Sequence, residues 1–204
     1  MSAAAEVVII DSGGANLASL QYALDRLQVR SVVSSEAAVI SAAPRVLLPG
    51  VGAAADAMAR LRRAGLVEVL RALSVPVLGI CLGMQLLYER SEEGDTACLG
   101  IVPGTVRRLA AAPGLPVPHM GWNSLEALAA DPLLAGLGPR DYVYFVHGYA
   151  APVGPDTIAS VDYGGAHTAV VRRGNFRGVQ FHPERSGPVG ARLLRNFLEP
   201  GGCC

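Results

Sequence analysis

Lysine is absent from this sequence, and all 17 basic residues among its 204 are arginine. Chemistry that needs a side-chain amine is therefore excluded. This rules out a Schiff base with pyridoxal phosphate, a lysine nucleophile and the lysine of a Walker A phosphate-binding loop. The turn at Gly13-Gly14 does not match the Gly-x-Gly-x-x-Gly pattern of dinucleotide sites either. We expect no cofactor.

Charged residues are scarce, at 17% of the chain, and the formal net charge is zero. The arginines form no basic stripe, which proteins that bind nucleic acid through its phosphates need. No apolar run reaches the length of about 18 residues that suggests a transmembrane helix, and the N-terminus lacks the basic region of a signal peptide. We therefore expect neither a nucleic-acid partner nor association with a membrane.

Cysteine is rare as well. The four cysteines form no disulfide framework at this chain length, and no Cys-x-x-Cys pair is present to bind zinc. We therefore expect no metal site and a soluble protein of the reducing cytoplasm. The sequence assigns no role to Cys98, Cys203 or Cys204.

Apolar residues are abundant, at 51%, which is typical of a compact α/β protein. In the first half, apolar segments typical of buried strands alternate with segments of helical periodicity. The expected strands lie at 6–11, 29–34, 45–49 and 75–80, and the expected helices lie at 17–27, at 54–73 and from 82 onward. This alternation indicates a parallel sheet covered on both faces.

The second half has a different pattern, because short Gly-rich connections join its apolar segments. Its expected strands lie at 142–147, 157–163, 168–172 and 177–182, and a last helix is expected at 189–198. Short connections favour antiparallel pairing. We therefore predict an α/β fold with a mostly parallel central sheet, helices on both faces and an antiparallel section. A single domain over 1–204 is expected, with 200–204 as a frayed tail.

The most informative segment is Gly-Ile-Cys81-Leu-Gly at 79–83, directly after the strand expected at 75–80. It matches the Gly-x-nucleophile-x-Gly elbow, with a thiol in place of the usual serine. The glycines fit this interpretation because a Cβ on either would crowd the sharp turn from strand to helix. A helix starting near Leu82 would also favour a thiolate. The alternative is a buried structural cysteine that ends a core strand.

A thiol nucleophile needs a base, and the base needs an orienting group. His182-Pro183-Glu184 can supply both, since residues i and i+2 at a strand end point to the same side. The alternative is an exposed turn with a solvated carboxylate. His147 has no acidic neighbour in sequence and suits a site wall better. His119, in a stretch that reads as a loop, suits a functional loop or a hydrophobic plug equally well.

Pro49-Gly50-Val51-Gly52 follows an expected strand and precedes an expected helix. Backbone N–H groups in such a turn can face an anion. Together with the N–H of Leu82 they could form an oxyanion hole, in which each donor lowers the barrier by about 3–4 kcal/mol. The alternative is an ordinary turn that needs a positive φ angle.

These segments together resemble the class I, or triad, glutamine amidotransferases, which share the elbow at 79–83 and the His-Pro-Glu string at 182–184. Further strings resemble the glutaminase subunits of imidazole glycerol phosphate synthases, and the resemblance covers almost the whole chain. They are Leu-Pro-Gly-Val-Gly-Ala at 48–53, Pro-His-Met-Gly-Trp-Asn at 118–123 and Tyr-Phe-Val-His-Gly-Tyr at 144–149.

The resemblance implies a reaction and the residues that carry it out. Cys81 would be the nucleophile, His182 the general base and then acid, and Glu184 the group that orients His182. L-Glutamine would be hydrolysed to glutamate and ammonia through a γ-glutamyl thioester. The remaining implied residues are Val51, Gly52 and Leu82 at the oxyanion site and Gly50, Gln85 and Glu93 around the substrate.

The resemblance also implies a partner. A fold of this kind would use all 204 residues, so we expect a separate chain to consume the ammonia. By resemblance that chain is a cyclase subunit with a (β/α)8 barrel, which forms a heterodimer with this protein in histidine biosynthesis. The implied docking residues are Asn16, Trp122 and Arg185. The family's glycine-rich loop at 49–52 is thought to rearrange before its N–H points inward, so the resting enzyme would be slow.

Four positions depart from the family pattern. Ser12 and Ala15 replace an aromatic residue and a glycine in the first turn, and Gly148 replaces a serine or threonine. Arg185 stands where lysine is usual, which could alter an ion pair at the interface. None of these positions belongs to the triad.

Three other functions remain open from the residues alone. A glutaminase could feed another acceptor, in a pyridoxal phosphate or purine pathway, although those relatives carry different loops at 49–52 and 118–123. A cysteine hydrolase or peptidase would need an open cleft, whereas Gln85 and Glu93 suggest a small pocket. A regulatory module with a sensor cysteine would need the elbow but not the pair His182 and Glu184.

Overall fold

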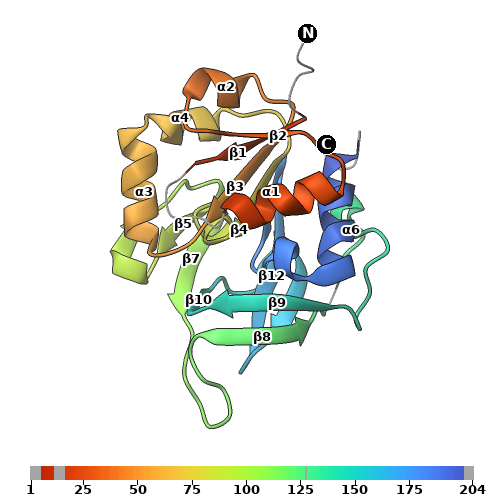
Figure 1. Ribbon diagram of the computed structural model, residues 1–204. Helices are drawn as coiled ribbons and strands as arrows, with labels where there is room; N and C mark the ends of the chain where they lie inside the picture. Colours follow the sequence, from red (N-terminus) through yellow and green to blue (C-terminus); the bar gives the residue numbers. More distant parts are fainter. Residues whose placement is uncertain (1–5, 12–16, 127, 200–204) are drawn as a thin grey trace.

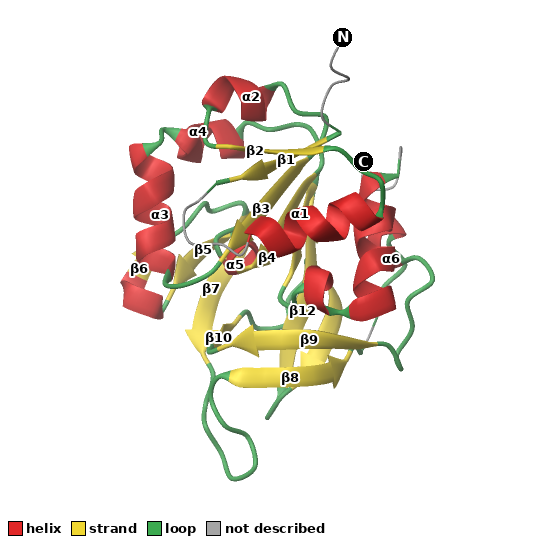
Figure 2. Cartoon of the chain, viewed as in Figure 1, coloured by secondary structure: helices red, strands yellow, loops and turns green. Residues whose placement is uncertain are grey.

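The computed structural model describes residues 6–11, 17–126 and 128–199. Its centre is a seven-stranded sheet in the order β11-β12-β13-β4-β3-β1-β2 (Figures 1 and 2). The five strands from β13 to β2 pair in parallel, whereas β11–β12 and β12–β13 pair antiparallel. The strands of this sheet are β1 (Val7–Ile10), β2 (Ser31–Ser34), β3 (Val46–Gly50), β4 (Val77–Cys81), β11 (Thr157–Asp162), β12 (Ala166–Arg173) and β13 (Phe176–Val179).

Helices cover both faces of the sheet, as the sequence predicts (Figure 1). One face packs against α1 (Leu17–Arg26) and α6 (Gly187–Leu198), and the other against α2 (Ala37–Ser41), α3 (Ala54–Arg63) and α4 (Leu66–Arg71). Alternate residues of the strands enter the two cores: Ile9 and Leu47 face α1 and α6, while Ile10 and Leu48 face the other helices. The strands β1, β3 and β4 are therefore apolar and buried along their whole length, because both sheet faces are covered there.

Two expected helices differ from the sequence prediction. The helix expected at 54–73 is broken between α3 and α4, where Gly65 has a φ of +67°. A left-handed residue cannot continue a right-handed helix, and glycine adopts it at low cost. The helix expected from 82 onward is a single turn, α5 (Leu82–Gln85), before the chain enters β5 (Tyr88–Ser91).

The second half departs from the prediction at two strands: the one expected at 177–182 ends at Val179, and the one at 142–147 has a different partner. β9 (Tyr142–His147) does not join the central sheet but pairs with β8 (His119–Ser124) in a two-stranded ribbon, so the stretch read as a loop at 118–123 is largely a strand. Figure 1 shows this ribbon across one end of the molecule. A smaller sheet comprises β5, β6 (Thr96–Ala97), β7 (Val102–Arg108) and β10 (Tyr149–Ala150). The described residues also form short 3₁₀ turns at η1 (Glu93–Asp95), η2 (Pro132–Leu134) and η3 (Pro183–Arg185).

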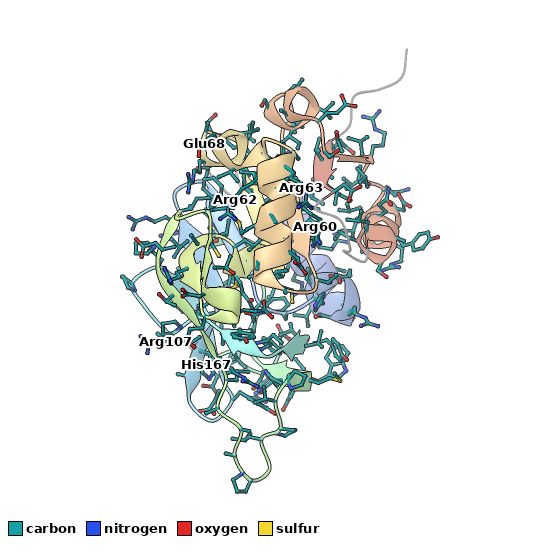
Figure 3. All side chains as sticks on the ribbon, turned by 90° about the vertical axis from the view of Figure 1, so that its left-hand side faces the viewer. Arg60, Arg62, Arg63, Glu68, Arg107 and His167 are labelled. Carbon is teal, nitrogen blue, oxygen red and sulfur yellow. The ribbon has the colours of Figure 1, made fainter. Side chains whose placement is uncertain are left out.

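Two arginines, one in α3 and one in α4, donate hydrogen bonds to backbone carbonyls of the segment that follows β5. Arg62 Nη2 donates to the carbonyl of Ala97 at 2.8 Å, and Arg71 Nε donates to that of Leu99 at 2.8 Å. Arg71 also pairs with Glu68 at 2.7 Å. Figure 3 shows Arg60, Arg62 and Arg63 along α3 with Glu68 beyond its end. A guanidinium has five donors, so one side chain can bind both a carbonyl and a carboxylate.

Neighbouring parallel strands bring the predicted site residues to one edge of the sheet. β3 ends at Gly50 and β4 at Cys81, and these two residues are register partners. On the other side of β4, Val179 of β13 pairs with Ile80, and the chain continues to His182. Carboxyl ends of parallel strands are where open α/β sheets form their sites. Among the described residues, no helix is long and apolar enough to cross a bilayer.

Candidate active site

Cys81 occupies a strained turn between β4 and α5. Its φ of 54° and ψ of −113° are unusual for a residue with a side chain, and such strain is typical of functional sites. A Cβ built on Gly79 would lie 2.7 Å from the carbonyl oxygen of Gly83, and one built on Gly83 would overlap that of Leu48. Both glycines are therefore required by close packing, as the elbow pattern predicts. Because α5 has only one turn, its dipole is smaller than the expected longer helix would give.

His182 and Glu184 lie together beside the elbow. Nδ1 of His182 is 2.8 Å from Oε1 of Glu184, and both side chains are buried. They are placed by the 3₁₀ turn η3 and not by a strand, because β13 ends at Val179. Ser186 Oγ donates to the carbonyl of His182 at 2.7 Å and holds this turn. Within the described residues, Nε2 of His182 has no hydrogen-bond partner.

The electrostatics of this pair favour a charged imidazole. Burial alone would lower the pKa of His182, but its interactions with Cys81 and Glu184 outweigh burial and raise this pKa to about 10. An imidazolium next to Cys81 stabilises a thiolate. Protonated His182 is then a proton donor next to the predicted nucleophile.

A cavity of about 350 Å³ opens in front of Cys81, which is the size of a small-molecule site. It is lined by Val51, Gly52, Cys81, Leu82, Gln85, Glu93, Pro118, Val146, His147, Gly148, Tyr149, His182, Glu184 and Arg185. The cavity therefore brings together the predicted nucleophile, base and orienting group with all but one of the predicted oxyanion and substrate residues. Among the described residues, no three His, Cys, Asp or Glu side chains are grouped as metal ligands would be.

The predicted substrate residues occupy different positions around this cavity. Gln85 is buried in α5, and its Nε2 donates to the carbonyl of Tyr149 and to Oε1 of Gln180, both at 2.9 Å. Glu93 lines the cavity and its Oε2 accepts from the N–H of Ala54 at 2.8 Å, so it caps α3 from outside. Gly50 is not part of the lining, since it is buried in β3 beside Cys81.

The three predicted oxyanion residues lie on two segments that meet at Cys81. Val51 and Gly52 follow β3, and Gly52 has a φ of +85°. Leu82 is the first residue of α5, where a backbone N–H has no acceptor within the helix. Glycine is favoured at 52 by that positive φ angle.

Two buried histidines form a second hydrogen-bonded pair next to the cavity. His147 Nδ1 is 2.9 Å from the carbonyl of Tyr149, and His147 Nε2 is 3.1 Å from Nδ1 of His119. A carbonyl can only accept, so His147 carries its proton on Nδ1, and Nδ1 of His119 must donate to Nε2 of His147. His119 is stacked between Phe145 and Tyr163. Its position supports the hydrophobic plug, and that of His147 supports the site wall.

This histidine pair predicts a loss of stability in acid. Burial lowers the pKa of His147 to about 3 and that of His119 to about 4. Below about pH 6.5 the unfolded chain binds protons at these imidazoles that the folded protein does not. Because the unfolded state gains the protons, the free energy of unfolding should fall between pH 6.5 and 5, by up to about 1.4 kcal/mol per pH unit and histidine.

Urea unfolding at several pH values measures this slope, and His147→Gln is the informative variant because glutamine still donates to Tyr149. In this variant, the unfolding free energy should fall less steeply between pH 6.5 and 5 than in the natural chain. The difference should be up to about 1.4 kcal/mol per pH unit, which corresponds to about one proton. Equal slopes in the two proteins would contradict the assignment.

Of the predicted docking residues, Trp122 lies on the outer surface of the ribbon and Arg185 lies in η3 next to it. Asn16 is outside the described residues, together with Ser12 and Ala15. Trp122 is 55% exposed, and its ring is 5.9 Å from that of Tyr144. The guanidinium of Arg185 lies 5.5 Å above the same tyrosine ring. Met120 and Tyr142, 63% and 56% exposed, extend this surface, which we call the ribbon face (Met120, Trp122, Tyr142, Tyr144 and Arg185).

Gly148 and Gln180 also lie at this site. Gly148 lines the cavity, and a Cβ built there would meet only Val117 at 3.8 Å, so a side chain would fit where the family has serine or threonine. Gln180 contacts both Gln85 and Cys81 and is not among the site residues predicted from the sequence. The available signal was its spacing two residues before His182, on the same side of an extended segment.

Similarity to known proteins shows the family of this chain. The family model for class I glutamine amidotransferases matches residues 8–200. The chain is 61% identical to the imidazole glycerol phosphate synthase subunit HisH of Xanthomonas euvesicatoria pv. vesicatoria, over 95% of this chain and 97% of that protein. It is 57% identical to the HisH subunit of Xylella fastidiosa (strain Temecula1), with the same coverage.

Solved structures resemble the fold at much lower identity. A glutamine amidotransferase crystal structure superposes with a TM-score of 0.73 at 22% identity, covering 94% of this chain and 96% of that one. A glutamine amidotransferase from Thermotoga maritima gives a TM-score of 0.62 at 16% identity, covering 94% and 81%. The chain therefore belongs to the class I glutamine amidotransferases, in the family of the HisH subunits of imidazole glycerol phosphate synthase.

Proposed function

We propose that this protein hydrolyses L-glutamine to L-glutamate and ammonia at Cys81 and delivers the ammonia to a cyclase subunit. The observation that carries the proposal is the convergence of Cys81 and the hydrogen-bonded pair His182–Glu184 on one small cavity. A nucleophile, a base and an orienting carboxylate are the groups that acyl transfer requires.

In the proposed reaction, the Cys81 thiolate attacks the carbonyl carbon of the glutamine side-chain amide. The tetrahedral intermediate collapses as the carbon–nitrogen bond breaks, and His182 gives its proton to the departing ammonia. His182 then takes a proton from water as that water attacks the γ-glutamyl thioester, which releases glutamate and restores Cys81. Glu184 keeps the imidazole oriented through its hydrogen bond to Nδ1.

The negative charge of the tetrahedral oxygen needs donors, and we assign these to backbone N–H groups of Val51, Gly52 and Leu82. All three residues line the cavity next to Cys81. Gln85 and Glu93 would hold the substrate from the opposite side. Since both amide protons of Gln85 are already used within the protein, only its oxygen remains free to accept from glutamine.

The proposed partner is the cyclase, a (β/α)8 barrel, docked on the ribbon face. HisH relatives are named as subunits of a synthase. The ribbon face has the composition of an interface core, with exposed aromatic residues, a methionine and an arginine. Arg185 both lines the cavity and belongs to this face, so the cavity lies next to the proposed docking surface. Ammonia, as a small product, would have a short way to the partner. The cytoplasmic location remains a prediction from the sequence.

Glutamate release measured with and without the purified cyclase and its nucleotide ligand tests the function. We expect slow hydrolysis by the isolated chain and a rise of about 10- to 100-fold in the ligand-bound complex, the usual range of coupling between sites. Rapid hydrolysis that does not respond to the cyclase would contradict the proposed coupling. Hydrolysis of peptides in preference to glutamine would indicate a peptidase.

A matched pair of surface variants locates the docking site. Trp122→Ala should weaken the activation by the cyclase, because exposed tryptophans at the centre of an interface often carry much of the binding energy. Val153→Ala also removes an exposed apolar side chain, 50% exposed, away from the ribbon face and should retain full activation. Equal activation of the two variants would place the interface elsewhere.

A further inference from the structure

A buried glutamine, Gln180, contacts both the predicted nucleophile Cys81 and Gln85 of α5. Gln180 is fully buried and directly follows β13, whose register pairs Val179 with Ile80 of β4. Gln180 therefore comes next to Cys81 at the end of two adjacent parallel strands. Its Nε2 lies 3.8 Å from Sγ of Cys81, a distance that suits a hydrogen bond to sulfur.

The orientation of this amide follows from a single backbone carbonyl. Nε2 of Gln85 donates to the carbonyl of Tyr149, which can only accept, so the NH2 end of Gln85 is fixed. The same nitrogen lies 2.9 Å from the side chain of Gln180, which must present its oxygen there. The NH2 group of Gln180 consequently points at the sulfur, and this assignment does not depend on an arbitrary choice of amide flip.

Besides its interaction with His182, the sulfur has contacts with Val146 and Gln180, and these two contacts favour different protonation states. The carbonyl of Val146, 3.8 Å from Sγ, can only accept a proton and therefore suits the thiol. The N–H of Gln180 donates, and a donor binds an anionic sulfur more strongly than a neutral one. Of the two contacts, only that of Gln180 stabilises the thiolate.

We propose that Gln180 is a positioning residue for the reaction: it holds Sγ of Cys81 and stabilises its thiolate by donating a hydrogen bond, while Gln85 fixes the direction of that donor. This rests on the proposed function only in that Cys81 is the nucleophile. It also links Gln85, at the substrate cavity, to the sulfur through one intervening side chain. A substrate that binds Gln85 and shifts its side chain would therefore also move Gln180, which donates to Cys81.

Two variants separate the donor from the acceptor of Gln180. Gln180→Glu retains an oxygen that accepts from Gln85 but offers the sulfur no amide donor. Gln180→Met has a similar length and retains neither group. Gln21→Met, on α1, is the matched control for replacing a glutamine by methionine. The reaction of each protein with iodoacetamide is followed from pH 5 to 10 by mass spectrometry of the Cys81 peptide, and Cys98 in the same protein serves as an internal reference.

Loss of a hydrogen bond to a charged group corresponds to about a tenfold or larger effect. We expect both Gln180 variants to be alkylated at Cys81 about tenfold more slowly at pH 7, with the half-maximal rate moved to higher pH. The control and the Cys98 reactivity should not change. Glutaminase kcat should fall by a similar factor while KM changes less. An unchanged pH profile at Cys81 in both variants would overturn the proposal.

A measurement on the natural chain does not depend on the folding of any variant. The side-chain amide resonances of Gln180 should shift with pH along the same curve as the alkylation of Cys81, and should not do so once Cys81 is alkylated. If the Gln180 amide resonances changed neither with the ionisation of Cys81 nor with its alkylation, the proposed hydrogen bond from Gln180 to Cys81 would be contradicted. Neither the alkylation nor the NMR measurement uses the substrate L-glutamine. Their results are therefore independent of the proposed glutaminase activity.

Discussion

Replacement of Cys81 by alanine is expected to abolish glutamine-dependent activity, with a loss of more than about 10⁴-fold in kcat. The reason is chemical: without sulfur no γ-glutamyl thioester can form, and the remaining groups only polarise the amide. The side chain is small and buried, so the variant should fold. Glutamate release measured in the complex with the cyclase gives the result.

The same variant provides its own control. Because the proposed cyclase reaction consumes ammonia at a separate chain, the Cys81→Ala complex should still turn over when ammonium is supplied in solution. Ammonium-dependent activity equal to that of the natural complex would show that only the glutamine half-reaction was lost. If Cys81→Ala retained glutamine turnover, the nucleophile would have to be another residue.

Gly83→Ala should have the largest effect on stability, because the new methyl group would overlap the carbonyl oxygen of Leu48 in β3. A backbone carbonyl inside a parallel sheet cannot move aside as a flexible side chain can. Overpacking of this kind typically costs 1–3 kcal/mol, and we expect at least about 3 kcal/mol here. For a chain of this length that corresponds to a fall of about 10 °C in the unfolding midpoint.

Gly154→Ala is the matched control, since a Cβ there has no neighbour within 4 Å and the φ angle of Gly154 is not positive. Thermal unfolding followed by circular dichroism should place Gly154→Ala within about 0.5 kcal/mol of the natural chain, as for an ordinary surface change. If the two variants unfolded at the same temperature, close packing would not be the reason for a glycine at 83.

The parallel part of the fold was predictable because its inner strands β1, β3 and β4 are apolar along their whole length. The side chains of Val7 to Ile10 alternate between two buried cores. A continuous apolar run of this kind is typical of a strand that is covered on both faces. The ribbon of β8 and β9 was harder to predict. Its outer surface exposes Met120, Trp122 and Tyr142, so a stretch that reads as a loop is a strand with one unusual, apolar outer face.

The three predicted catalytic residues could be identified from the sequence, but the residues that hold them in place could not. Cys81, His182 and Glu184 are marked by strings of the sequence itself, and the structure places them together. The contacts of Gln180 depend on which residues meet across β4, β13 and α5, and the backbone carbonyl of Tyr149 takes part through the fold and not through its side chain. The spacing of Gln180 from His182 is a signal in the sequence, but it does not show these partners. The length of α5 was also misjudged, because four helical residues and a longer helix begin with the same pattern.

The capping of α3 by Glu93 has a consequence for the segment that would supply the oxyanion donors. Gly50 is fixed in the sheet opposite Cys81, and the N–H of Ala54 is tied to Glu93. Only residues 51–53 lie between these two anchors. A span of three residues with both ends held cannot swing as a lid does. It can reorient an N–H only by rotating a peptide plane in place, a crankshaft motion that leaves the flanking strand and helix where they are.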